Sequence, residues 1–138
     1  MWIVEISRRC RRIRAREAKA LLGLRLYDGA YYLAGYAVEC ALKACIAKGT
    51  QKYEFPDKGK VISSYSHKLG DLVTVAGLAD VRTEYSRLSP EFRTNWQVVQ
   101  SWSEESRYHR HEAEAARELV AAVGDSRHGV ISWIKRYW

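Results

Sequence analysis

A long segment with almost no charge, residues 28–48, limits most strongly what this chain can fold into. It reads DGAYYLAGYAVECALKACIAK and contains no proline, with Asp28 in the position of a helix N-cap and Gly49 in the position of a C-cap. Small and apolar side chains occur on every side of the helix that this segment would form. A helix that is apolar nearly all round belongs in the middle of a bundle. The sequence therefore predicts a central helix of about five turns.

Two charged residues, Glu39 and Lys43, interrupt the apolar character of this predicted helix. Their spacing of four residues places them on one helix face, with the acid before the base. An interior carboxylate needs a partner, and we expect Arg107, from the late part of the chain, to pair with Glu39. Glu39, Lys43 and Arg107 would then form one network. The sequence leaves open whether that network lines a groove or is sealed in the core.

Most of the net charge of +7 comes from the N-terminal segment. Residues 1–27 carry eight basic and two acidic side chains, whereas the other 111 residues carry 15 basic and 14 acidic ones. Apolar residues recur at helical spacing and predict a helix over residues 3–22. They are Ile3, Ile6, Cys10 and Ile13. The arginines on the outer surface would either bind RNA phosphates or form a solvated helix face.

The three cysteines give no complete set of pairs. With an odd count and no signal peptide, we expect Cys10, Cys40 and Cys45 to be reduced and the protein to be cytoplasmic. Cys40 and Cys45 are five residues apart on a helix, which does not suit a zinc site, so no metal is expected. No apolar run is long enough to cross a bilayer, and we expect no membrane association.

Signals for further helices follow the central segment. Residues 50–66 show no sustained period and predict a long connecting loop. His67, at the start of the next short helix, would either contact a ligand or serve in packing or capping. Ser89 and Pro90 predict the start of another helix, whose buried side is apolar. That side consists of Phe92, Trp96, Val99 and Trp102. A last short helix is expected over residues 130–138.

Residues 107–111 combine two arginines and two histidines just before an apolar helical pattern. We expect that helix to begin near Tyr108 or His111. The unpaired N–H groups and positive dipole of a helix N-terminus favour an anion such as phosphate. Arg107 and Arg110 would add charge-assisted hydrogen bonds to it.

Three blocks of this sequence resemble the HEPN family of small helical domains. They are YDGAYYLAGYAVECALKA, WSEESRY and GVISWIKRYW, the first of which is similar to a family helix that reads Gly-Tyr-x-x-Glu-x-x-Leu-Lys. The resemblance implies one all-α domain over residues 1–138, an up-and-down bundle of five to six helices that forms a homodimer. It also implies a module that binds a nucleotide, RNA or a protein partner, and no cofactor. The partner would be a nucleotidyltransferase antitoxin in a toxin–antitoxin or defence system.

The resemblance also raises an alternative, a metal-independent endoribonuclease toxin. HEPN ribonucleases carry an Arg followed, after four to six residues, by a His, in which Arg stabilises phosphate charge and His transfers a proton. Arg107 and His111 enclose three residues, so they depart from this spacing, although on one helix they would share a face. For the binding module, an apolar cleft rimmed by Tyr32, Tyr36 and Tyr108 would lie over the charged network. The candidate binding residues are Glu39, Lys43, Tyr36, Tyr108 and Arg110.

Overall fold

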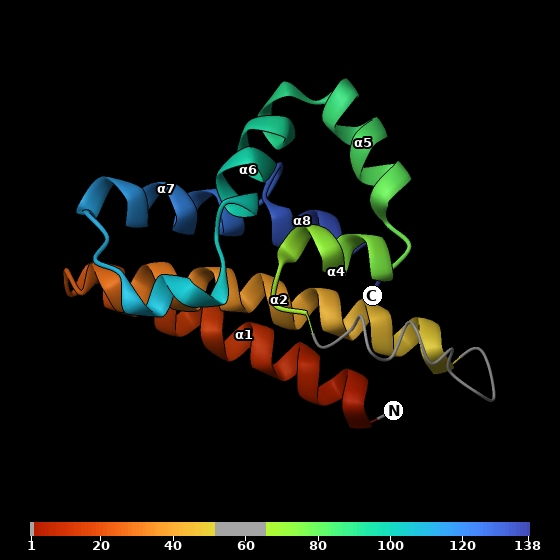
Figure 1. Cartoon of the computed structure of the whole chain (residues 1–138), viewed down its shortest axis with the longest axis horizontal. Helices are drawn as coiled ribbons and strands as arrows, with labels where there is room; N and C mark the ends of the chain where they lie inside the picture. Colours follow the sequence, from red (N-terminus) through yellow and green to blue (C-terminus); the bar gives the residue numbers. More distant parts are fainter. Residues whose placement is uncertain (1, 52–65) are drawn as a thin grey trace.

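The structure, a computed structural model, describes residues 2–51 and 66–138, and the expected loop after Gln51 lies almost entirely outside them. Within this part of the chain every regular element is a helix, which confirms the all-α prediction (Figure 1). Residues 2–51 and 66–138 contain seven α-helices, more than the five or six expected. The elements are α1 (Trp2–Gly23), α2 (Tyr27–Gln51), α4 (Leu69–Val75), α5 (Ala79–Leu88), α6 (Pro90–Gln100), the 3-10 helix η1 (Glu104–Tyr108), α7 (Ala113–Gly124) and α8 (Val130–Ile134).

Helix α2 is the centre of the fold, as its apolar sequence predicts. It packs against α1, α4, η1, α7 and α8, and its middle residues from Ala37 to Leu42 are buried (Figure 1). The helix begins one residue earlier and ends later than predicted, so Asp28 lies in its first turn and Gly49 lies inside it. Asp28 is therefore not the N-cap. Its carboxylate instead accepts a hydrogen bond of 2.6 Å from the backbone N–H of His111.

Helix α1 lies along α2, but its buried face is not the predicted one. Val4 and Ala18 are 4% and 1% exposed, whereas Ile6 and Ile13 are exposed. The side chain of Ile3 lies outside the described residues. Two apolar stripes compete on this helix, and the one with the small residue Ala18 lies against α2, since small side chains allow the closer approach of two helices. Ile6 and Ile13 are left facing solvent.

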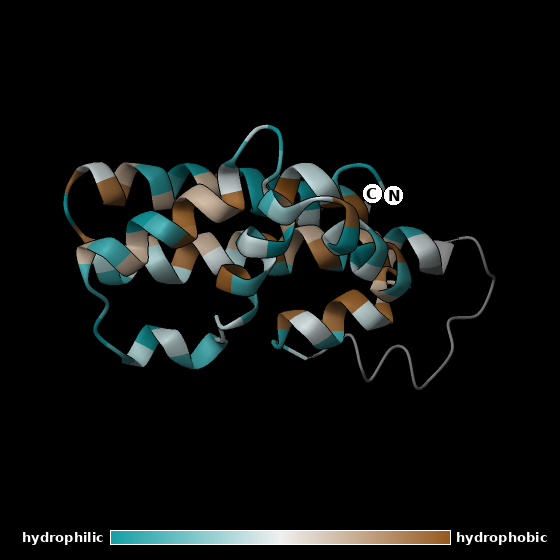
Figure 2. Cartoon of the chain, turned by 90° about the horizontal axis from the view of Figure 1, so that it is seen from above, coloured by the Kyte–Doolittle hydropathy of each residue, from teal (hydrophilic) through white to brown (hydrophobic). Residues whose placement is uncertain are grey.

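The second half of the chain forms a cap of short helices over α2. Ser89 is the N-cap of α6, and its hydroxyl accepts a hydrogen bond of 3.2 Å from Phe92 N–H, which confirms the predicted helix start. The predicted buried side is also confirmed, because Phe92, Trp96, Val99 and Trp102 are all buried. Along the helices, apolar and polar residues alternate around the axis (Figure 2).

Cys10 of α1 and Cys40 of α2 form a disulfide, with a Cα–Cα distance of 6.0 Å. The expectation of three unpaired cysteines was therefore wrong. The two residues are 30 positions apart, and only the side-by-side packing of α1 and α2 brings them together. Cys45 is free and buried.

None of the helices in the described part of the chain has the length and apolar character needed to cross a membrane.

Candidate functional site

The carboxylate of Glu39 is buried in the middle of α2 and is the starting point of a polar network. Its side chain is 3% exposed, and Lys43 lies 3.5 Å away on the same helix, which confirms the predicted pair. The second partner is His67, whose Nδ1 lies 2.8 Å from Glu39 Oε1. Two partners thus offset the cost of burying this carboxylate.

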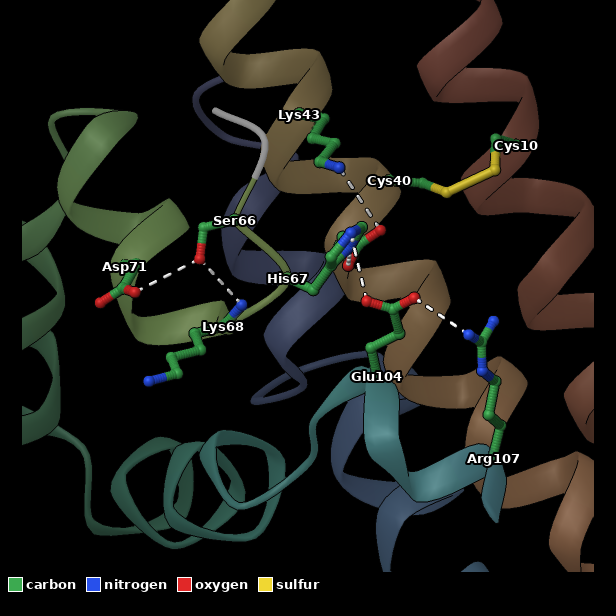
Figure 3. A network of polar contacts seen from close by, with 10 residues as sticks. Cys10, Cys40, Lys43, Ser66, His67, Lys68, Asp71, Glu104 and Arg107 are labelled. Atoms are coloured by element: carbon green, nitrogen blue, oxygen red, sulfur yellow. Dashed lines mark hydrogen bonds and ion pairs between the residues drawn. A yellow bond between two sulfur atoms is a disulfide. The ribbon is translucent and has the colours of Figure 1, made fainter. Parts of the chain in front are cut away.

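His67 connects Glu39 to a second acid, Glu104 of η1. The other ring nitrogen, Nε2, lies 3.2 Å from Glu104 Oε2, and Figure 3 shows the imidazole between α2 and η1. Both contacts are hydrogen bonds at the same time only when both ring nitrogens carry hydrogen, because carboxylates accept and do not donate. His67 therefore joins three segments that are distant in sequence, and it is not the N-cap of α4, which is Lys68.

Arg107 reaches the network through Glu104 and not through Glu39. Its Nη2 lies 3.5 Å from Glu104 Oε1, so the expected direct pair of Arg107 with Glu39 was wrong (Figure 3). The reason is the intervening His67, which occupies the open side of the buried carboxylate. Glu39, Lys43 and Arg107 still belong to one network, which extends from the core to the surface.

Arg107 also contacts aromatic residues at the surface. Its Nη2 donates a hydrogen bond of 2.7 Å to the hydroxyl of Tyr108, whose side chain is 72% exposed. Burial raises the pKa of Tyr32, and the charge of the neighbouring Arg107, together with its hydrogen bond to the phenol, opposes that rise. The guanidinium is thus shared between Glu104, Tyr108 and Tyr32.

A row of tyrosines continues from this arginine along α2. The rings of Tyr32 and Tyr36 stack with their centroids 5.9 Å apart, and Arg14 of α1 lies over the ring of Tyr36 at 5.9 Å. We call Tyr108, Tyr32 and Tyr36 the tyrosine row. Arg107 contacts both Tyr108 and Tyr32, and Arg14 lies over Tyr36. The sequence prediction of a shared tyrosine surface did not include Arg14.

His111 has partners different from those of Arg107. Its ring stacks on Tyr31 at 3.8 Å, and its Nε2 lies 2.8 Å from the carbonyl oxygen of Ser106. Tyr31 and Tyr32 are neighbours on α2 and therefore point in different directions, about 100° apart around the helix. The two residues of the alternative nuclease site therefore contact different tyrosines of α2, while the His111 ring also contacts the backbone of Ser106, next to Arg107.

The helix expected near Tyr108 or His111 begins at Ala113, two residues after His111, so residues 107–111 are not its first turn. Arg107 lies in the 3-10 helix η1, and α7 begins only at Ala113, so Arg107 and His111 do not share a helix face. The N-cap of α7 is Glu112, and Glu114 lies in its first turn. These carboxylates occupy the positive end of the helix dipole, which makes that end less suitable for phosphate.

Arg110 and His111 line a separate cleft of about 370 Å³ at the junction of α1 and α2. Arg25, with a positive φ of 62°, and Asp28 line the same cleft. The predicted binding residues are therefore divided among three places. Glu39 and Lys43 belong to the network, Tyr36 and Tyr108 to the tyrosine row, and Arg110 to this cleft.

Glu104 and Tyr31 are the site residues that the sequence prediction missed. Glu104 stands three positions before Arg107, a spacing at which an acid and a base can pair on a helical turn. That signal was present in the sequence. The stacking of Tyr31 on His111 joins residues 80 positions apart and has no local signal.

In the described residues, no group of three or more His, Cys, Asp and Glu side chains is arranged to hold a metal ion. What the arrangement offers is a surface of aromatic rings and guanidinium groups supported by a buried carboxylate. Such a surface can bind anions and planar groups.

Fold and site together define an all-α helical domain with a buried carboxylate–histidine network and an arginine-flanked tyrosine row. No family model matches the chain, and no curated protein or solved structure matches it either.

Proposed function

We propose that this chain is a HEPN-type module that binds single-stranded RNA or a nucleotide on the tyrosine row. The observation that carries the proposal is the placing of two arginines against partly exposed tyrosines. Arg107 contacts Tyr108 and Tyr32, and Arg14 lies over Tyr36, which stacks on Tyr32. Aromatic rings stack on bases of any sequence, and guanidinium groups bind the phosphates between them. The net charge of +7 would add a nonspecific attraction to RNA.

The polar network gives this surface its support. Glu104 holds Arg107, and His67 ties Glu104 to the buried Glu39. Glu39 is sealed from solvent, so in this proposal it positions the surface and does not touch RNA. Lys43 is partly exposed beside it. The HEPN resemblance supports the same class of function through Gly35, Tyr36 and Glu39.

The proposal is tested by fluorescence anisotropy with a labelled oligouridine in EDTA. Tyr108→Ala and Arg107→Gln alter exposed side chains, so both variants should fold, and each should weaken binding about five- to tenfold, in line with a loss of roughly 1 kcal/mol or more per stacked base. Arg93→Gln, an exposed arginine of α6, is the matched control and should lose much less. Equal losses in Arg107→Gln and Arg93→Gln would reject a specific site.

Binding should also fall steeply with salt, because bound phosphates release counterions. Deleting residues 1–16 is not a clean test of the arginine segment, since Val4 is part of the core and α1 packs along α2. Charge substitutions on the outer face of α1 are the better choice. Affinity that does not change with salt would argue against phosphate contacts.

The alternative endoribonuclease remains a prediction, and the same samples decide it. Electrophoresis of the RNA after incubation would show cleavage by the wild type and none by the Arg107→Ala, His111→Ala double variant. Arg107 and His111 have different partners and do not share a helix, and this supports the binding module. A homodimer or a nucleotidyltransferase antitoxin as partner also remains part of the proposal, and sedimentation of the chain alone tests the first.

A further inference from the structure

A groove between α1 and α7 lies away from the polar network and is not used by the proposed function. Its volume is about 370 Å³, and its floor is aliphatic. The floor and the α7 side consist of Ala15, Ala18, Ala34, Val120, Val123 and Gly124. Helices α1 and α7 both pack on α2 but have few contacts with each other.

Four cations line the α1 side of this groove. They are Arg11, Arg12, Arg16 and Lys19. Among the contacts of the described residues, none of the four has an acidic partner, whereas Arg14 on the same helix pairs with Glu17. Burial, and then the charge of Arg12, lower the pKa of Arg11. The pKa of Lys135, the C-cap of α8, is lowered by burial and then by the charges of Arg11 and Arg12.

We propose that this groove docks an amphipathic helix with acidic side chains from a protein partner. A helix lying between α1 and α7 would place apolar side chains on the aliphatic floor and carboxylates beside the four cations, the helix-in-groove mode of recognition. The small residues Ala15, Ala18 and Gly124 allow the backbone of such a helix to come close. The cations would gain the acidic partners that they lack within the chain.

Two other occupants fit the groove less well. RNA would place polar base edges on a floor of alanine and valine that offers no side-chain hydrogen bonds and no aromatic ring for stacking. A second copy of the chain docking through α1 would bring like charges together, because α1 carries many more basic than acidic residues. An acidic amphipathic helix therefore fits the groove better than RNA or a second copy of the chain.

The test uses an 18-residue synthetic helical peptide with an Ala/Leu face flanked by Glu, and a second peptide with Gln in place of Glu. Binding is measured by fluorescence anisotropy on the full chain. The acidic peptide should bind, and the Gln peptide should bind about tenfold more weakly. Arg12→Gln with Arg16→Gln should weaken the acidic peptide about five- to tenfold, as expected for two exposed charge pairs.

A control and a second variant make the outcome specific to this groove. Arg93→Gln with Arg127→Gln also lowers the formal net charge by two, from +7 to +5, and should leave binding within about twofold of the wild type. Ala15→Leu fills the floor without changing charge and should weaken binding at least fivefold, whereas Ala121→Leu, exposed on α7 outside the groove, should not.

Several results would overturn the proposal. They are no binding of the acidic peptide, equal binding of the two peptides, and equal losses in the two double variants. Unchanged binding in Ala15→Leu would also overturn it. If the peptide displaces oligouridine, and Ala15→Leu weakens oligouridine binding, the groove binds RNA. If sedimentation shows a dimer that Ala15→Leu abolishes, the groove binds a second copy of the chain.

Discussion

His67 Nδ1 lies 2.8 Å from Glu39 Oε1, and this contact, together with Lys43, satisfies the one buried carboxylate of the central helix among the described residues. The histidine comes from the segment just before α4, and the glutamate from the middle of α2. Because the imidazole also contacts Glu104, this pair determines how η1 and Arg107 sit on α2. The stability of the fold and the geometry of the tyrosine row are thus linked.

Replacing Glu39 with Gln should lower the free energy of unfolding by about 1–3 kcal/mol, since Gln cannot satisfy both His67 and Lys43. Urea denaturation followed by circular dichroism measures the change. Glu84→Gln is the control, because Glu84 pairs with Arg87 on the exposed face of α5 and its loss should matter little. Similar losses in the two variants would show that the Glu39 carboxylate is not buried as described.

A double-mutant cycle should show that Glu39 is coupled to His67 and not directly to Arg107. For Glu39→Gln with His67→Ala, residues in contact, we expect a coupling free energy of roughly 0.5–3 kcal/mol. For Glu39→Gln with Arg107→Gln, which belong to one network but are not in contact, the coupling free energy should be smaller than that with His67. A larger coupling free energy with Arg107 than with His67 would instead indicate the direct Glu39–Arg107 ion pair that the sequence suggested.

The central helix was predictable because its signal is local. Twenty residues without proline and with few charges can form only a buried helix here, and the cap of α6 at Ser89 is equally local. Helix ends were less predictable. Gly49 has an ordinary place inside α2, because one glycine costs only about 1 kcal/mol in a helix.

The site was only partly predictable, since its partners come from distant segments. A buried acid implies a cation or hydrogen-bond donor as its partner, but the sequence alone cannot choose between Arg107 and His67. In the structure, His67 is the residue that contacts Glu39. The Cys10–Cys40 disulfide was missed for the same reason, because its two residues are distant in sequence and meet only when α1 packs on α2. On α1, two apolar stripes were present, and only packing against α2 selects the one with Val4 and Ala18.

Replacing Gly35 with Ala should destabilise the fold, because a Cβ atom at this position would overlap the indole of Trp102. Trp102 is fully buried and cannot move aside without strain, so we expect a loss of about 1–3 kcal/mol in unfolding free energy. Gly70→Ala in α4 has open space around the new Cβ and should cause no loss. Thermal denaturation of the two variants in parallel distinguishes a packing effect from a general preference for glycine.

Thiol counting should give one reactive cysteine in the unfolded, unreduced protein and three after reduction. Cys10 and Cys40 are joined, which leaves Cys45 as the free thiol. In the folded protein Cys45 should resist iodoacetamide at pH 8, because burial raises its pKa to about 11 and only about one molecule in a thousand then carries the reactive thiolate. Its labelling should become faster as the pH rises toward that value. Mass spectrometry of alkylated samples measures each count, and three labels without reductant would show that the disulfide does not form.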